Sequence, residues 1–376
     1  MVMSLRDRIL AVYTGETPDV VPCMLDLSHW FYHSRKKPWD LSLAYEEPEY
    51  ELIDYHKRAG IGFYVPNLAA FLTIEYEGDV SAEVVRESRS GRVEIAWRYV
   101  TPLGRIERRR VWNEDTYSWA ISEWGVRTEQ DARILAYAMS RRRFVPHWDR
   151  YEAWADYVGD CGLVYLPIGY SAVGHLLHYW MGVEGFTYAA ADWPSTMREV
   201  VRGVNENNLQ CIDAVAKSPA EVILMGDNFS SDVQPPHFFD EWSRAYYSEA
   251  IARLHRAGKY AAMHVDGRLK GALAMVKSAG ADCADAVTPV PMGDLSPEEC
   301  RLEAGTDLIL SGGVSPDLWL PNAGVEEFKT AVLRWLDLKK YGPRLIASAG
   351  DQVPPGAVED RISLFRDLVE EWGRFE

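Results

Sequence analysis

The sequence predicts a fold of the α/β class, a (β/α)8 TIM barrel into which an antiparallel β hairpin or small sheet is inserted. Three observations support this prediction. Eight short apolar runs recur along the chain, amphipathic segments separate most of them, and one interval breaks the alternation with a period of two residues. Continuous apolar runs separated by helices are typical of a parallel sheet that helices cover, and eight such strands can close into a barrel.

The eight apolar runs are the predicted barrel strands. They occupy residues 20–27, 62–68, 163–170, 221–228, 260–267, 283–290, 308–315 and 344–351. The segment 235–259 between two of them places apolar residues three and four positions apart and carries a Gly stop at Gly258, as expected of a covering helix. The first 19 residues predict an amphipathic helix and a turn rather than a signal peptide, because charged residues interrupt the apolar run there.

Residues 71 to about 125 do not follow the barrel pattern. Apolar and polar residues alternate there, and a Pro-Leu-Gly turn separates two alternating stretches. This pattern predicts an inserted antiparallel hairpin or small sheet beside the barrel. No internal repeat or low-complexity linker is present, so we expect one domain that spans residues 1–376 and contains this insertion.

The composition excludes several classes of partner. The chain has 56 acidic and 40 basic residues, a formal net charge of −16, which repels nucleic-acid phosphates and anionic lipid surfaces. No apolar run approaches the ~18 residues of a membrane-spanning helix. We therefore expect a cytoplasmic protein without a nucleic-acid or membrane partner. The five cysteines show no close pairing, which predicts reduced and mostly buried thiols.

Polar residues follow the predicted strands where each leaves the core. In a barrel of this kind the loops after the strands converge at one end, and catalytic groups come from several strand ends. His264 and Asp266 end the run AAMHVDG and are two residues apart, which places both side chains on one face of a strand. Together with Asp351 and Asp227, they are the predicted catalytic residues. A His and a carboxylate at this spacing can bind a metal, transfer a proton, or simply stabilise a loop.

Five further residues near the strand ends are predicted to contact substrate. A packed or interface histidine is the alternative for His29, and a loop or cap residue is the alternative for Asp227. His29 is retained from a group of histidines in aromatic surroundings because it closely follows the first strand. The predicted substrate-binding set is Asp26, His29, Asn67, Tyr170 and Asn228.

Seven motifs are spread over nearly the whole length of the chain: RILAVYTGETPDVVP, IGYSAVGHLLHYWMGVEGF, MGDNFSSDVQPPHFFDEW, HVDG, TPVPMGDLSPEECRLEAG, LSGGVSP and AGDQVPPGAVEDRI. In these motifs the chain resembles the uroporphyrinogen decarboxylase superfamily, which also contains zinc-dependent cobalamin methyltransferases. The members of that superfamily are (β/α)8 barrels.

The resemblance is closer to the corrinoid-dependent methyltransferase and O-demethylase branch. The true decarboxylase has arginines after its first strand for the propionates of its substrate, whereas this chain has PCMLDLSHWFYHSR there. The methyltransferases hold zinc with a His-x-Cys pair and a later Cys. The matching positions here are His264, Asp266 and Asp351, so the resemblance implies zinc or another divalent metal on an oxygen and nitrogen donor set.

The resemblance implies methyl transfer between a small substrate, such as a methoxylated aromatic compound, and a corrinoid that a partner protein supplies. A homodimer is a further expected assembly. Two alternatives stay open. One is a decarboxylase or lyase that acts on a small acid or a tetrapyrrole, with Asp227 or His264 as proton donor. The other is a non-catalytic protein that binds a corrinoid or tetrapyrrole in the barrel mouth.

Overall fold

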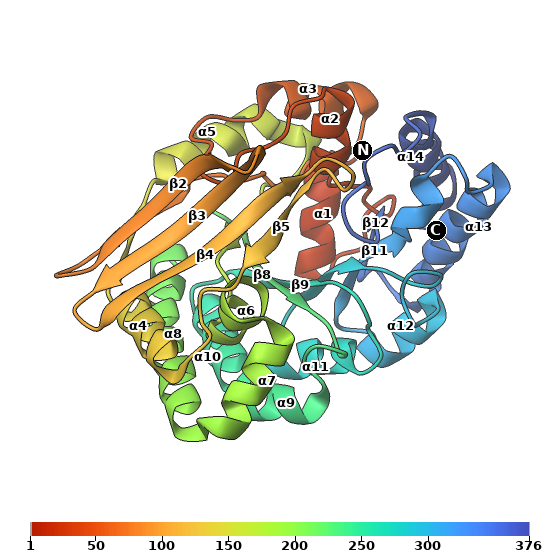
Figure 1. The fold of residues 1–376 in the computed structure, drawn as a ribbon. Coiled ribbons are helices and arrows are strands. Elements are labelled where there is room, and N and C mark those ends of the chain that lie inside the picture. Colours follow the sequence, from red (N-terminus) through yellow and green to blue (C-terminus); the bar gives the residue numbers. More distant parts are fainter. Residues whose placement is uncertain (1, 376) are drawn as a thin grey trace.

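A computed structural model describes residues 2–375 and contains a six-stranded parallel sheet (Figure 1). Its strands coincide with six of the eight predicted runs, although β8 extends one residue beyond its run, and their order in the sheet follows their order in the chain. They are β7 (Leu166–Ile168), β8 (Val222–Phe229), β9 (Tyr260–Val265), β10 (Cys283–Val287), β11 (Ile309–Val314) and β12 (Leu345–Ala349).

Two short extended segments complete the ring between β12 and β7. They belong to the first two predicted runs and form isolated parallel bridges rather than regular strands. The Met24 amide donates to the Ala347 carbonyl at 3.0 Å, and the Gly62 amide donates to the Cys23 carbonyl at 2.8 Å. Leu163 donates to the Phe63 carbonyl at 3.0 Å and links the second segment to the start of the third run. The prediction of a (β/α)8 barrel is therefore confirmed, with six regular strands and two minimal ones.

One end of the barrel is filled by apolar side chains. Each of the eight extended segments contributes at least one buried residue to a single cluster: Met24, Tyr64, Tyr165, Leu224, Ala262, Cys283, Ile309 and Ile346. Helix α1 (Leu5–Thr14) adds Ile9, Val12 and Tyr13 to this cluster, and the Tyr13 hydroxyl donates to that of Tyr165 at 2.9 Å. Tyr13 also packs on Tyr260, the first residue of β9, so α1 closes the end where the strands begin.

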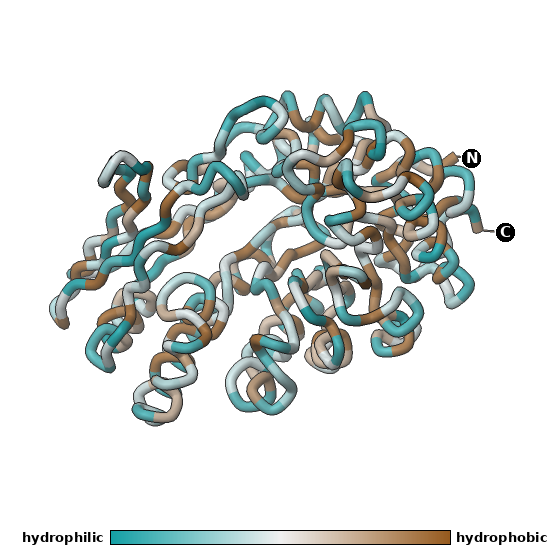
Figure 2. The backbone as a smooth tube through the Cα atoms, turned by 45° about the vertical axis from the view of Figure 1, so that its right-hand side comes forward, coloured by the Kyte–Doolittle hydropathy of each residue, from teal (hydrophilic) through white to brown (hydrophobic). Residues whose placement is uncertain are grey.

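Helices follow each strand and cover the outside of the barrel. Apolar residues of the strands alternate between the inner cluster and a larger core beneath these helices, and in Figure 2 the central strands are predominantly brown. The helices are α2 (Ser28–Ser34), α3 (Tyr50–Ala59), α5 (Trp148–Val158), α6 (Ala172–His175), α7 (Gly182–Asp192), α8 (Pro194–Val215), α9 (Pro236–Trp242), α10 (Arg244–Arg256), α11 (Ala272–Ala279), α12 (Pro297–Ala304), α13 (Val325–Leu336) and α14 (Asp360–Trp372), with shorter turns η1 (Gly159–Cys161), η2 (Leu176–Trp180), η3 (Pro316–Trp319) and η4 (Asp337–Tyr341).

The inserted antiparallel sheet lies between the second and third barrel segments, as predicted. Its four strands are consecutive and extend to one side of the barrel in Figure 1: β2 (Ser81–Arg89), β3 (Arg92–Thr101), β4 (Gly104–Asn113) and β5 (Ser118–Glu123). A separate ribbon pairs β1 (Leu72–Tyr76) with β6 (Arg142–Pro146), which follows helix α4 (Glu129–Ser140). The antiparallel structure thus extends past residue 125. Strand β6 is not recognisable in the sequence because a run of charged residues precedes Phe144.

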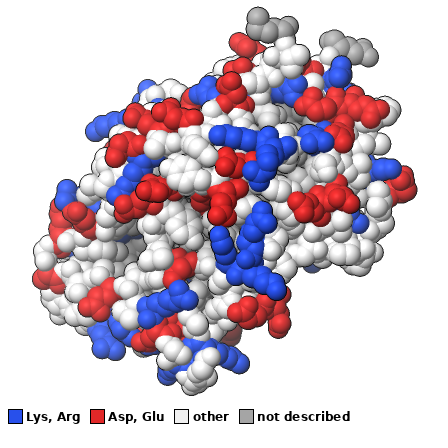
Figure 3. Space-filling view, turned by 90° about the horizontal axis from the view of Figure 1, so that it is seen from above, with Lys and Arg blue, Asp and Glu red and all other residues white. Residues whose placement is uncertain are grey.

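The surface mixes charges of both signs. On the face seen in Figure 3, acidic and basic side chains are interspersed. Ion pairs on the surface of the protein include that of Arg334 with Glu298. None of the helices within residues 2–375 combines the length and apolar character needed to cross a bilayer.

Candidate active site

A polar layer lies directly above the apolar layer inside the barrel. Side chains two residues apart on a strand point to the same side, so the residues two positions after the apolar layer also point inward. At five of the eight segments these residues carry a polar group: Asp26, His264, Asp285, Ser311 and Ser348. The apolar run AAM therefore ends in His264 because that side chain leaves the sealed end of the barrel and enters the open end.

His264 is held between two carboxyl groups in this layer. Asp285 is paired with His264 in the β9–β10 register, and its Oδ2 lies 3.2 Å from His264 Nδ1. Asp285 also accepts a hydrogen bond from the Ser311 hydroxyl at 3.3 Å, and its side chain is 2% exposed. On the other side of the ring, His264 Nε2 lies 3.8 Å from Asp351 Oδ1. The imidazole thus has a buried carboxylate behind it and directs Nε2 toward the mouth, where its side chain is 21% exposed.

This arrangement determines the charge of the site. Burial acts to lower the pKa of His264, but the hydrogen bond to Asp285 and the charges of Asp351 and Asp266 outweigh burial and raise it to about 9. Burial raises the pKa of Asp351 to about 6, against the opposing effect of the His264 charge. At neutral pH these shifts favour an imidazolium at His264 and an ionised carboxylate at Asp351.

Three more predicted residues form a chain along the rim of neighbouring strands. The Tyr170 hydroxyl donates to Asn228 Oδ1 at 3.1 Å, and Asn228 Nδ2 donates to Asp266 Oδ2 at 3.2 Å. Asn228 has a φ of +46°, a left-handed conformation that Asn tolerates better than most residues. The last residue of β9 is Val265, so Asp266 lies beyond the strand and its exposed carboxylate is directed to Asn228.

The metal set implied by the resemblance does not converge in this arrangement. Among residues 2–375, no three His, Cys, Asp or Glu side chains lie close enough together to hold a metal ion. His264 and Asp351 offer two donors that face each other, and Asp285 is placed as the partner that orients a ligating imidazole. The third expected donor, Asp266, is hydrogen-bonded to Asn228. The metal therefore stays a prediction, and no catalytic step below depends on it.

Asp227 and Asp26 are engaged by the protein itself. Asp227 is 2% exposed and accepts hydrogen bonds from the Ser171 amide at 2.7 Å and from the Tyr247 hydroxyl. Burial raises its pKa. Asp26 accepts from the Ser28 amide at 2.9 Å and from Gln352 Nε2 at 3.0 Å, and burial raises its pKa as well. Asp26 shares the inner layer with His264, whereas the contacts of Asp227 are those of a buried structural carboxyl.

His29 and Asn67 lie where the insertion meets the barrel. His29 Nε2 is 3.0 Å from the Tyr117 carbonyl, its ring packs edge-on against Trp39, and burial lowers its pKa. The backbone N–H of Asn67 donates to Glu49 Oε2 at 2.8 Å. The substrate contacts predicted for both residues stay predictions.

The sequence-based prediction missed Asp285. The available signal was an acidic residue in the middle of the apolar run CADAVTPV, which a buried strand accepts only where the charge is paired. Counting positions by two from Cys283 also places Asp285 in the inner layer.

Comparison with solved structures agrees with the barrel. A methyltransferase from Methanosarcina mazei matches with a TM-score of 0.65 and 14% sequence identity, over 98% of this chain and 99% of that one. This likeness establishes the fold. Weaker matches include a type I 3-dehydroquinate dehydratase from Clostridium difficile (TM-score 0.30, 10% identity, 65% of this chain and 76% of that one). A xylose isomerase domain protein from Planctomyces limnophilus gives a TM-score of 0.34 and 10% identity over 65% of this chain and 84% of that one. No curated protein sequence matches the chain.

Comparison with protein families identifies one family. The uroporphyrinogen decarboxylase (URO-D) model matches residues 172–372, which is more than half of the 376 residues. The matched region contains His264, Asp285 and Asp351, and with them the centre of the polar layer. The chain therefore belongs to the uroporphyrinogen decarboxylase family.

Proposed function

We propose that the protein is a methyltransferase that moves a methyl group between a small substrate, such as a methoxylated aromatic compound, and a corrinoid carried by a partner protein. One observation carries the proposal: the imidazole of His264 is held at the open end of the barrel between Asp285 and Asp351, and these carboxyl groups raise its pKa. Membership of the family and the fold shared with a methyltransferase support the choice of reaction.

The chemistry of a methyl ether explains why such a group is needed. An alkoxide or phenoxide is a basic leaving group, so the ether oxygen must gain a proton as its bond to the methyl carbon breaks. His264 Nε2 would supply that proton to the oxygen while the methyl group passes to the corrinoid, which serves as a nucleophilic acceptor. Asp285 would keep Nδ1 protonated and the ring oriented, and Asp351 would stabilise the imidazolium before transfer.

The rim chain would orient the substrate. Tyr170, Asn228 and Asp266 are joined by hydrogen bonds and approach the mouth from three consecutive strands. Asp26 approaches the mouth from the first segment. It accepts a hydrogen bond from Gln352, the residue that follows Asp351. These groups offer donors and acceptors on opposite sides of His264, as expected of a pocket that positions one small molecule.

A direct assay tests the proposal. Purified protein is incubated with reduced cobalamin as a free corrinoid acceptor and with methyl donors of three classes: a methoxylated aromatic compound, a methylamine and methanol. We expect the absorbance of the reduced corrinoid to decline with one donor class, and the rate to depend on enzyme concentration. No transfer from any class by folded protein, with and without added zinc, would contradict the proposal.

The metal is a separate prediction with its own measurement. A divalent ion bound through His264 and Asp351 would replace the proton on Nε2 and activate the ether oxygen in its stead, so the two modes exclude each other. In the metal mode, protein purified without chelator would contain a stoichiometric ion that Asp351→Ala loses. Elemental analysis of both proteins decides this. A wild-type protein without an ion after incubation with zinc would contradict it and leave the proton donor as the principal activating group.

We expect a bell-shaped pH–activity profile whose acidic limb lies near pH 6 and whose basic limb lies near pH 9. Its acidic limb reflects Asp351, whose raised pKa of about 6 leaves it ionised only above that pH. Its basic limb reflects His264, whose raised pKa of about 9 keeps the proton donor charged below that pH and loses it above. The profile of kcat/KM checks this, and Asp351→Asn is expected to abolish the acidic limb and move the basic limb to lower pH. A basic limb that does not move in this variant would contradict the assignment.

Decarboxylation of a small acid is the second candidate, and the family match favours it. The same imidazolium could attract a substrate carboxylate and then protonate the carbon that loses CO2. This reaction is expected to need neither a corrinoid nor a metal. Release of CO2 from a candidate acid, at full rate after exhaustive chelation, would select it over methyl transfer.

A further inference from the structure

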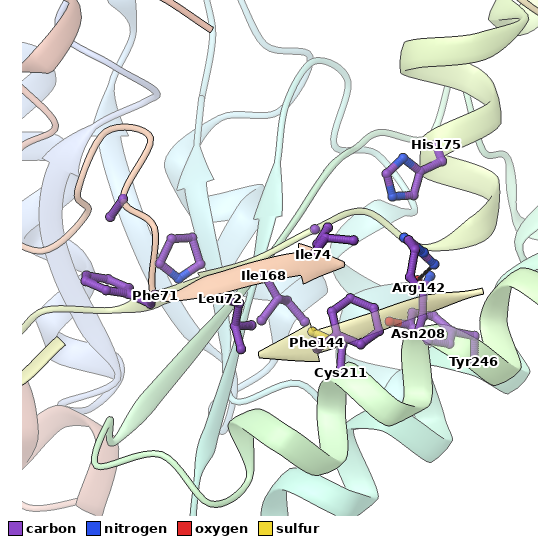
Figure 4. A pocket seen from close by; sticks show the side chains of 13 residues that line it. Phe71, Leu72, Ile74, Arg142, Phe144, Ile168, His175, Asn208, Cys211 and Tyr246 are labelled. Carbon is purple, nitrogen blue, oxygen red and sulfur yellow. Dashed lines mark hydrogen bonds between the residues drawn. The ribbon is translucent and has the colours of Figure 1, made fainter. Parts of the chain in front are cut away.

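A second cavity lies outside the barrel, between the β1–β6 ribbon and the outer side of β7. Its volume is about 220 Å³ (Figure 4). Helices α8 and α10 contribute Asn208, Cys211 and Tyr246 to its wall, and the ribbon contributes Leu72, Arg142 and Phe144. Ile168 of β7 also lines it and belongs to the core beneath the helices rather than to the inner layer of the barrel. This cavity is therefore distinct from the polar layer that holds His264.

The cavity contains a buried cation without an acidic partner. Arg142 is 6% exposed, donates from Nε to the Met139 carbonyl at 2.9 Å and from Nη2 to Asn208 Oδ1 at 2.7 Å. No carboxylate within residues 2–375 lies within 4.0 Å of its guanidinium, and no Asp or Glu lines the cavity. In a chain with 16 more acidic than basic residues, a buried guanidinium without a counter-charge is unexpected, because buried charges are normally paired.

A second guanidinium strengthens the positive potential there. Arg108 is 7% exposed, stacks on Trp97 at 3.8 Å, and has neither an ion pair nor a hydrogen-bond partner for Nε and Nη1 among the described residues. His175, which lines the cavity, is affected by both arginines: burial and then the charges of Arg142 and Arg108 hold its pKa well below its ordinary value. Burial is the larger cause, and the two guanidinium charges act in the same direction on this imidazole.

We propose that this cavity binds a small organic anion, with a carboxylate on Arg142 and a flat apolar body between Leu72, Phe144 and Ile168. A cavity of about 220 Å³ has room for roughly seven water molecules at about 30 Å³ each, which suits an acid of the size of benzoate. An apolar pocket with few polar anchors is the usual design of a small-molecule site. This proposal does not depend on the proposed methyl transfer, and the site uses none of the groups at the barrel mouth.

Asn208 connects the cavity to the barrel mouth. Its Oδ1 accepts from Arg142, while its Nδ2 donates to the carbonyl of Tyr170 at 3.1 Å. Tyr170 begins the rim chain that continues through Asn228. An anion that draws the guanidinium away from Asn208 would therefore alter the support of a predicted substrate-binding residue, which gives the site a route to influence the mouth.

Binding measurements with benzoate test the proposal. By titration calorimetry, the wild-type protein is expected to bind benzoate at least about tenfold more tightly than benzamide, which has the same shape without the charge. Arg142→Gln is expected to abolish this preference. Arg141→Gln is the matched control, because Arg141 is exposed and its guanidinium lies over Tyr137 on the surface. His264→Gln is expected to bind benzoate like the wild type, which separates this site from the mouth.

A second variant tests the proposal independently of whether Arg142→Gln folds. Leu72→Trp fills the cavity from its half-buried rim and leaves Arg142 in place, and it is expected to exclude benzoate while its circular dichroism is unchanged. Anomalous scattering from 4-iodobenzoate in crystals is expected to place the ligand beside Arg142. The proposal is overturned if the wild type does not bind benzoate, if Arg142→Gln binds it equally well, or if the iodine lies elsewhere.

Discussion

Replacing His264 by glutamine is expected to lower kcat by ~10²- to 10⁴-fold, the range that a positioned general acid contributes. Glutamine keeps a polar side chain in the inner layer but has no proton to transfer at neutral pH. The loss should appear in kcat rather than in KM, because the proton moves only in the transition state. Steady-state kinetics with the donor found in the corrinoid assay, or CO2 release if decarboxylation is found instead, provide the measurement.

A histidine on the surface provides the matched control. His255 also pairs with a carboxylate, since its Nε2 lies 2.8 Å from Asp282 Oδ2, but it is exposed at the end of α10. His255→Gln should therefore leave kcat unchanged. Asp285→Asn should keep the fold and move the basic limb of the pH profile downward, because the hydrogen bond to Asp285 helps to raise the pKa of His264. Full activity in His264→Gln would remove His264 from the mechanism.

Replacing Asp227 by alanine is expected to destabilise the protein by ~2–5 kcal/mol, the cost of leaving two buried donors without an acceptor. These donors are the Ser171 amide, at the start of α6, and the Tyr247 hydroxyl on α10. Asp227 therefore joins two covering helices to the end of β8, and its loss should loosen both. The midpoint of urea unfolding, followed by circular dichroism, provides the measurement.

This result separates the structural role of Asp227 from the catalytic one that the sequence predicts. Asp232→Ala, in the loop that follows β8 and exposed, should leave the midpoint unchanged. A catalytic Asp227 would instead lose activity in Asp227→Asn with little change in stability. That outcome would show that the carboxyl, despite its burial, takes part in the reaction.

The sequence predicted the barrel well because burial on both sides makes its strands continuously apolar. The first two runs form only isolated bridges, since Pro22 and Gly62 weaken regular pairing there, but their backbones still close the ring. Gly162 shows how closely these backbones approach: a Cβ at this position would lie 1.9 Å from the Phe63 carbonyl oxygen. Strand β6 was missed because its arginines resemble a surface loop.

The candidate site was predicted in part. His264 and Asp351 do meet across the mouth, because strand ends converge in a barrel whatever their distance in sequence. The spacing of His264 and Asp266 was less informative, since strand geometry ends at Val265 and a hydrogen bond from Asn228 then directs the second carboxylate. The hydrogen bonds that engage Asp227 come from helices distant in sequence, and no local pattern reveals them.

Helix α1 closes the end of the barrel where the strands begin, so the interior is open only at the opposite end. Ile9, Val12 and Tyr13 are at most 2% exposed, so neither water nor a small molecule passes beneath the polar layer. Substrate, product and protons must therefore enter and leave through the open end beside Asp351. In the proposed methyl transfer, the corrinoid-carrying partner would dock over this open end and block further entry, so the small substrate is expected to bind first and the demethylated product to leave after the partner dissociates. The kinetics of the two reactants should accordingly follow a compulsory order.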